Sequence, residues 1–237
     1  KKVLRDAAKT MEDKSLSAEE RLAAAQSSDI ERLHETNPLR DGLSESNPQR
    51  FRVERPKSSF ASWYQFFPRS EGAYYGEDGK IVPGNLKTSV AGLERAAAEG
   101  FNIVYLPPIF PIGVTNRKGR NNTLVAGPDD PGSPFGIGSE LGGHDTVDPL
   151  LGTMDDFKAF CAHAHELGLE VALDFALQCS PDHPWVKQHP NWFRTKPDGT
   201  IAFAENPPKK YQDIYPIDFN ADMEGIEAET ERIMDLW

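Results

Sequence analysis

Apolar positions follow two periods along the chain from residue 51 onward, one typical of strands and one typical of helices. Short apolar runs predict strands over residues 62–67, 101–106 and 169–175. Apolar residues three or four positions apart predict helices over residues 88–99, 153–167 and 222–237. The first two of these helices end at Gly100 and Gly168, and glycine is common just after a helix.

Strands that alternate with helices predict a parallel sheet with crossover helices. Long polar insertions, residues 111–152 and 177–221, follow the second and third strands. Active sites form at these strand ends in (β/α)8 barrels, and ligands also bind there in doubly wound sheets. No Gly-x-Gly-x-x-Gly sequence opens a helix, which weakens the nucleotide-binding form. We therefore expect an α/β fold, the first part of a (β/α)8 TIM barrel, spanning residues 51–237, with a small B-domain-like excursion over residues 177–221.

The first 50 residues are charged and helical in character. Ser17-Ala-Glu-Glu20 is a capping-box pattern, and residues 28–34 continue the helical pattern until Asn37-Pro38. No catalytic pattern occurs in this segment. We expect a helical hairpin that packs against another domain or against a second copy of the chain in a homodimer.

The net charge of -11 excludes a general nucleic-acid partner, because phosphate backbones require a basic surface. The longest apolar stretch is interrupted by Asn102 and prolines, so no membrane partner is expected. The N-terminal residues lack the apolar core of a secretory signal, which favours a cytoplasmic location. The chain begins with Lys1 instead of Met, and we expect a piece of a longer protein.

The two cysteines, Cys161 and Cys179, predict no disulfide framework, and no cluster has the spacing of zinc ligands. Buried thiols in a reducing compartment are the expectation for both. No metal or organic cofactor is expected.

Several strings resemble the GlgE-type maltosyltransferases of glycoside hydrolase family thirteen, the α-amylase superfamily. They occur in the order of that family and cover residues 60–237. The strings are Trp63-Tyr-Gln-Phe-Phe-Pro-Arg-Ser70, Val104-Tyr-Leu-Pro-Pro108, Asn116-Arg-Lys-Gly-Arg-Asn-Asn-Thr123, Pro131-Gly-Ser-Pro-Phe135, Gly142-Gly-His-Asp145, Leu173-Asp-Phe-Ala-Leu-Gln-Cys-Ser-Pro-Asp-His-Pro-Trp185 and Ala204-Glu-Asn-Pro-Pro-Lys-Lys-Tyr-Gln-Asp-Ile-Tyr-Pro216.

The resemblance implies a retaining transfer of a maltosyl unit from maltose 1-phosphate to an α-glucan. In the family an Asp after the fourth barrel strand attacks the anomeric carbon, and a Glu after the fifth is the acid/base, so that a glycosyl ester forms and is captured by the acceptor. A third carboxylate comes later. We expect these carboxylates beyond Trp237, with no catalytic residue in this chain.

The end of the third strand departs from the amylase pattern. The wider superfamily has Asp-x-x-x-Asn-His there, and this chain has Asp174-Phe-Ala-Leu-Gln178-Cys179. The resemblance implies that Gln178 hydrogen-bonds the donor sugar. Asp174 is either a substrate-side carboxylate or a structural one that braces the loop.

Asn206-Pro-Pro-Lys-Lys-Tyr211 supplies an amide, an ammonium and a phenol on a proline-stiffened loop. These donor types suit a phosphate dianion. By resemblance, Asn206, Lys209 and Tyr211 bind the phosphate, although an ordinary solvated loop would have the same composition.

Two further groups are assigned by the resemblance. Lys118 and Asn122 are expected to contact the non-reducing sugar, with Ser133 shaping the same pocket. His144 and Asp145 are expected to be structural. Six aromatic residues are interpreted as packing residues and not as platforms on which sugars stack. Trp63, Tyr64, Phe66 and Phe67 are expected in the barrel core, and Trp185 and Trp192 in loop packing.

Two alternatives to the maltosyltransferase interpretation stay open. One is an amylase-like hydrolase or trehalose-forming transglycosidase, which has no need for the phosphate residues. The other is a non-catalytic glucan-binding or interaction module.

Overall fold

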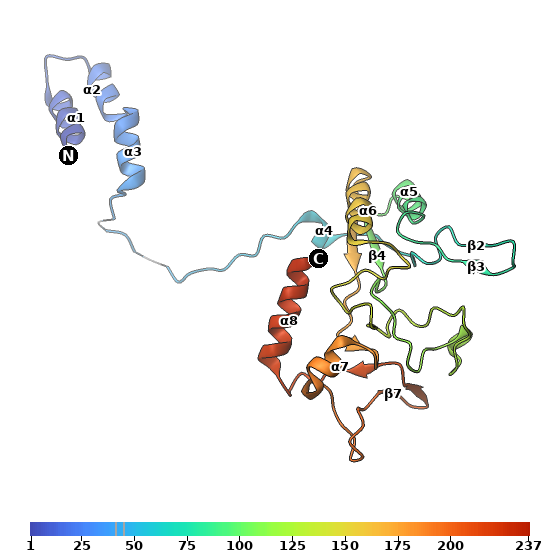
Figure 1. The fold of residues 1–237 in the computed structure, drawn as a ribbon. Helices are drawn as coiled ribbons and strands as arrows, with labels where there is room; N and C mark the ends of the chain where they lie inside the picture. Colours follow the sequence, from blue (N-terminus) through green and yellow to red (C-terminus); the bar gives the residue numbers. More distant parts are fainter. Residues whose placement is uncertain (41, 45) are drawn as a thin grey trace. The chain divides into compact units, whose positions relative to one another are not determined.

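The computed structural model describes residues 1–40, 42–44 and 46–237. These residues divide into two compact units, residues 1–53 and residues 54–237 (Figure 1). The first unit is helical, and the second combines helices with short strands.

The first unit contains helices α1 (Lys2–Glu12), α2 (Ala18–Ala25) and α3 (Ser28–Thr36). The predicted capping box starts α2: the amide of Glu20 donates to Ser17 Oγ at 3.2 Å, and the amide of Ser17 donates to Glu20 Oε2 at 2.9 Å. Ile30 of α3 is buried. The described residues of this unit thus form three helices, where the sequence predicted a helical hairpin.

The second unit opens with the short helix α4 (Pro56–Ser59) and is built on a three-stranded sheet. Its strands are β1 (Trp63–Gln65), β4 (Ile103–Leu106) and β5 (Glu170–Leu173), in the order β1-β4-β5. Both pairings are parallel, as predicted, and place Val104 opposite Tyr64 on one side and Val171 on the other. Between β1 and β4 the chain also makes a small hairpin, β2 (Tyr74–Tyr75) and β3 (Ile81–Val82), which the sequence pattern did not predict.

Helices α5 (Val90–Ala98) and α6 (Met154–Glu166) connect the parallel strands, and Figure 1 shows both beside β4. Thr153 caps α6 in a second capping box with Asp156. Buried side chains of both helices, such as Leu93 and Phe160, pack with Val104 of the sheet in one cluster. Each fully buried side chain of this size contributes about 1.5–3 kcal/mol.

Long excursions leave the sheet after β4 and after β5, where the sequence placed its insertions. The first contains the 3₁₀ helix η1 (Arg120–Asn122) and returns to the body through a bridge between Ile112 and Ile137. The second contains a hairpin and a separate antiparallel pair before the final helix α8 (Met223–Leu236). The hairpin is β7 (Ala204–Asn206) and β8 (Lys209–Tyr211), and the pair is β6 (Gln178–Cys179) and β9 (Tyr215–Pro216). The short helices α7 (Pro184–Gln188) and η2 (Pro190–Trp192) lie between β6 and β7.

A second buried cluster stabilises the later excursion and includes Trp185, Trp192 and Cys179. Both tryptophans therefore pack the loop, as interpreted from the sequence. Cys161 and Cys179 are both free.

The aromatic string of β1 is only half in the core. Phe66 is buried and Tyr64 is partly buried, whereas Trp63 and Phe67 are exposed. Successive side chains of a strand point to opposite faces, so one string cannot bury all four aromatic rings against the helices. Trp63 and Phe67, interpreted from the sequence as barrel core, are exposed on the face opposite the one that packs against the helices.

Candidate functional site

The candidate residues lie on the two excursions that follow the carboxyl ends of β4 and β5. This end of neighbouring parallel strands is where α/β folds build their sites. The first excursion carries Lys118, Asn122, Ser133, His144 and Asp145, and the second carries Asp174, Gln178, Asn206, Lys209 and Tyr211.

Lys118 ties the first excursion to the second. Its Nζ donates to Gln212 Oε1 at 2.7 Å and lies 3.9 Å from Asp213 Oδ1. Lys118 and Asp213 are both buried. Asp213 Oδ1 has no hydrogen-bond partner among the described residues, and burial raises the pKa of this carboxyl group. The ammonium of Lys118 and the carboxyl group of Asp213 thus join the two excursions in the interior of the unit.

Asp213 was missed by the sequence interpretation. It follows Tyr211 by two residues, but a single acid in an acidic chain gave no signal of its own. Only the fold brings it against Lys118.

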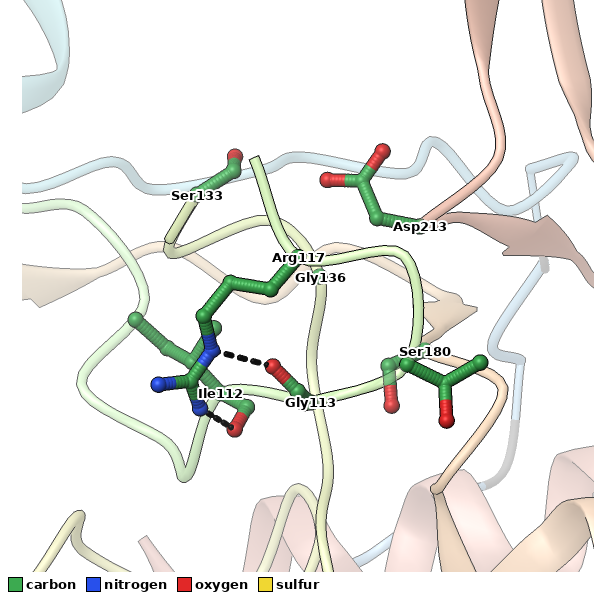
Figure 2. A pocket seen from close by; sticks show the side chains of 8 residues that line it. Ile112, Gly113, Arg117, Ser133, Gly136, Ser180 and Asp213 are labelled. Carbon is green, nitrogen blue, oxygen red and sulfur yellow. Dashed lines mark hydrogen bonds between the residues drawn. The ribbon is translucent and has the colours of Figure 1, made fainter. Parts of the chain in front are cut away.

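Ser133 and Asp213 line a small pocket, which Figure 2 shows from close by. The pocket has no room for even one water molecule, whereas ligand pockets measure roughly 300–1,000 Å³. Arg117 closes one side: its guanidinium donates to the carbonyl oxygens of Gly113 at 2.7 Å and Ile112 at 2.9 Å (Figure 2). The pocket is therefore a narrow gap between the two excursions that holds no sugar as it stands.

Asn206, Lys209 and Tyr211 share one face of the β7–β8 hairpin. Asn206 lies opposite Lys209, and Ala204 lies opposite Tyr211. Directly opposed residues of an antiparallel pair point to the same face, and so do residues two apart on one strand. The other face carries Glu205 and Lys210, which form an exposed ion pair at 3.8 Å. The three polar groups are thus gathered on one side, and Asn206 and Lys209 are exposed.

Gln178 connects the second excursion back to the first. It begins β6, and its Nε2 donates to the carbonyl oxygen of Phe135 at 3.0 Å. Phe135 itself donates its amide to Ser133 Oγ at 3.3 Å. Gln178 and Ser133 therefore lie on one hydrogen-bonded path.

Asp174 follows β5 directly and accepts a hydrogen bond from the hydroxyl of Tyr105 on β4. This bond raises the pKa of Tyr105 to about 12, because an ionised phenol would face the carboxylate. The backbone amide of Asp174 donates to the carbonyl oxygen of Leu106 at 2.9 Å. These contacts are those of a carboxylate that braces the strand end.

His144 is buried and contacts His183, while Asp145 forms an ion pair with Arg232 of α8 at 2.8 Å. Desolvation opposes ionisation of Asp145, but the hydrogen bond and charge of Arg232 hold its pKa below the usual value. Both residues hold the first excursion to the rest of the unit.

Asn122 is exposed at the end of η1, and its own φ is 61°.

Within the described residues, no group of three or more His, Cys, Asp and Glu side chains could hold a metal ion. No helix in the described part of the chain is long and apolar enough to cross a membrane.

Curated proteins match the chain from end to end. It is 81% identical over 238 residues to the α-1,4-glucan:maltose-1-phosphate maltosyltransferase of Bifidobacterium longum, covering 100% of the chain and 32% of that protein. It is 55% identical to maltosyltransferase 1 of Streptomyces coelicolor, over 96% of the chain and 33% of that protein. The maltosyltransferase of Mycobacterium tuberculosis is 54% identical over 92% of the chain and 31% of its own length. The chain thus spans about a third of the length of these relatives.

Solved α-amylases share the fold. An α-amylase from Lactobacillus plantarum matches with a TM-score of 0.53 and 32% identity over 74% of this chain and 35% of its own. A maltogenic α-amylase from Thermotoga neapolitana matches with a TM-score of 0.56 and 28% identity over 75% of this chain and 36% of its own. No family model matches the chain. Across the third of the relatives' length that it spans, the chain is similar throughout to the α-1,4-glucan:maltose-1-phosphate maltosyltransferases.

Proposed function

We propose that this chain forms the donor-binding part of a retaining maltosyltransferase. The enzyme moves a maltosyl unit from maltose 1-phosphate to the non-reducing end of an α-1,4-glucan and releases phosphate. The names of the relatives support this reaction, as does the arrangement of polar groups on the two excursions.

The observation that carries the proposal is the shared face of the β7–β8 hairpin. A phosphate dianion needs several donors that converge, and charge-assisted hydrogen bonds are the strong ones. Asn206, Lys209 and Tyr211 supply an amide, an ammonium and a hydroxyl from one side of the hairpin. The net charge of -11 otherwise repels such a ligand, so a local ammonium is needed to hold it.

The groups that bind the sugar are proposed to lie outside the hairpin, where the two excursions contact each other. Gln178 faces the donor sugar, and Lys118 with Asn122 contacts the non-reducing sugar. Asp213 would hold the ammonium of Lys118 in place, because its Oδ1 lies 3.9 Å from Lys118 Nζ. Ser133 shapes the small pocket next to Asp213.

The chemistry itself needs two carboxyl groups that flank the anomeric carbon. One attacks that carbon and expels phosphate, which forms a maltosyl ester. The other removes the proton from the acceptor 4-hydroxyl as this oxygen displaces the ester. By the resemblance these groups follow the fourth and fifth strands of a barrel, so we assign neither role to a residue of this chain.

We also infer the architecture, the self-association and the cellular location of the protein. The sheet β1-β4-β5 would be the first part of an eight-stranded barrel, in keeping with the similarity to α-amylases. Apolar side chains exposed on α1 and α2 would suit a homodimer contact. A cytoplasmic location would suit a sugar-phosphate substrate.

The second candidate function is an amylase-like hydrolase, which the fold of the α-amylases favours. Gln178 and Cys179 stand where amylases have Asn and His, and a hydrolase of neutral glucans has no use for the lysine of the hairpin. A non-catalytic binding module would leave the same residues without a reaction.

Phosphate release tests the proposal. The intact protein that carries this chain is mixed with maltose 1-phosphate and a maltooligosaccharide, with this chain alone measured beside it. We expect release by the intact protein and none by residues 1–237. Cleavage of plain glucan without phosphate release would replace the proposal with the hydrolase.

A further inference from the structure

Two buried histidines connect helix α7 to the strand end that carries Gln178. The backbone amide of Trp185 donates to His183 Nδ1 at 3.0 Å. His183 Nε2 lies 3.0 Å from His144 Nδ1, and His144 Nε2 lies 2.8 Å from the carbonyl oxygen of Ala176. Both imidazoles are only 1% exposed.

The two ends of this path fix both tautomers. A carbonyl oxygen can only accept, so His144 must carry its proton on Nε2 and accept on Nδ1. The proton between the rings therefore belongs to His183 Nε2. His183 Nδ1 is left as an acceptor, which matches the backbone amide that points at it. Every ring nitrogen has a partner only when both rings are neutral.

Glycines confine the ring of His183 on two sides. A Cβ at Gly138 would lie 2.2 Å from His183 Cδ2, and a Cβ at Gly143 would lie 2.5 Å from His183 Nε2. The ring of His144 stacks on Trp185 with centroids 4.8 Å apart and 14° between planes. A side chain at Gly138 or at Gly143 would therefore collide with the imidazole of His183.

The path ends two residues before Gln178. The carbonyl oxygen of Ala176 also accepts the backbone amide of Gln178 at 2.8 Å, so His144 and Gln178 share one acceptor. The Gln178 side chain is held at its far end by the carbonyl oxygen of Phe135. A shift of the Ala176 carbonyl group would therefore move Gln178, including the side-chain amide that is proposed to bind the donor sugar.

We propose that His183 is a positioning residue: by donating from Nε2 to His144, it fixes the Ala176 carbonyl and hence the Gln178 amide that binds the donor. The inference rests on the proposed function, because it gives Gln178 a substrate to bind. His183 itself touches no substrate in this scheme.

Two substitutions separate the two hydrogen bonds of His183. His183→Asn retains a short acceptor for the amide of Trp185 but cannot donate to His144. His183→Gln places an amide N–H near the position of Nε2 but loses the acceptor that begins α7. If His183 acts through His144, the Asn variant is impaired and the Gln variant recovers most of the activity.

The experiment uses the intact protein and follows phosphate release from maltose 1-phosphate. We expect His183→Asn to lower kcat/KM by about tenfold or more, since small misplacements of a binding group are costly. The double variant with Gln178→Ala should be no worse than Gln178→Ala alone, because both changes remove the same interaction. Equal losses in the Asn and Gln variants, or losses that multiply with Gln178→Ala, would overturn the proposal.

Imidazole ¹⁵N spectra of the same proteins decide the matter without activity. We expect the His144 Nδ1 resonance to shift in His183→Asn, where it loses its donor, and to stay in His183→Gln. An unchanged resonance in His183→Asn refutes the role of His183. Failure of the wild type to release phosphate would refute the proposed function, and the spectra would still report on the histidine path.

Discussion

Lys118 and Asp213 lie 3.9 Å apart in the interior, although they belong to excursions that follow different strands. Their side chains are only 5% and 6% exposed. Gln212 accepts the hydrogen bond of the ammonium at 2.7 Å, while Asp213 Oδ1 accepts no hydrogen bond from any residue that the structure describes. The pair therefore depends on the attraction between two charges removed from water.

Replacement of Lys118 by Met should destabilise the chain by about 3–5 kcal/mol, because it leaves a buried carboxylate without a counter-charge. The cost should be present above the folded-state pKa of Asp213 and should shrink as the pH falls below it, since a neutral carboxyl group needs no partner. Urea unfolding at several pH values measures the loss of stability and its dependence on pH.

The double variant K118M/D213N is the control. Asn cannot carry the buried charge, so most of the lost stability should return. Equal stability of K118M and the wild type at pH 7 would mean that the two charges do not interact.

Lys209 and Lys210 are adjacent lysines on opposite faces of the hairpin, so they form a matched pair. A hydrogen bond to a charged group contributes about 1.5–3 kcal/mol, which is a roughly 10- to 100-fold rise in KM for maltose 1-phosphate in K209A. K210A should change KM by about twofold or less, because an exposed ion pair contributes little. Phosphate-release kinetics of the intact protein compare the two, and equal effects would remove the phosphate site from this face.

The sheet and its helices could be predicted because their signals are local. Val90, Leu93 and Ala97 repeat at helical spacing, and Thr153 with Asp156 marks a helix start in the sequence itself. The exposure of Trp63 could not be predicted from such local signals, because it depends on which face of β1 the helices cover.

The sequence motifs predicted which residues belong to the candidate site, but they did not predict how these residues are arranged in space. Lys209 and Tyr211 were found by resemblance, but their shared face with Asn206 required the register of the hairpin. Asp213 and His183 were missed, because an acid and a histidine acquire meaning only through contacts with residues far along the chain.

Gly138 and Gly199 both have positive φ, 100° and 83°, but only Gly138 faces another side chain. Alanine at either position costs about 1–2 kcal/mol for the left-handed backbone. G138A should cost about 1–3 kcal/mol more, because its Cβ would lie 2.2 Å from His183 Cδ2, whereas a Cβ at Gly199 would meet no described residue beyond its chain neighbours within 4 Å. Urea unfolding of the two variants gives the difference, and equal losses would show that the loop moves aside freely.

Acid should destabilise the chain through its two buried histidines. Burial lowers the pKa of His144 to about 4 and, together with the charge of a protonated His144, lowers that of His183 to about 2. An unfolded histidine has a pKa near 6.5, so protons bind the unfolded state first. This contribution to stability is therefore complete above about pH 6.5 and is lost as the pH falls toward the folded-state values, by about 1.4 kcal/mol per pH unit for each histidine.

His183→Asn removes one of these two titrating groups while it retains an acceptor for the amide of Trp185. The variant should be less stable than the wild type at pH 7, because His144 loses its donor. Its stability should then fall less steeply with acid, so the two unfolding free energies should converge between about pH 6.5 and 4.5. Carboxylates titrate in both proteins and cancel in the difference. Parallel curves over this range would mean that His183 is protonated in the folded chain, which would contradict the neutral tautomers of the histidine path.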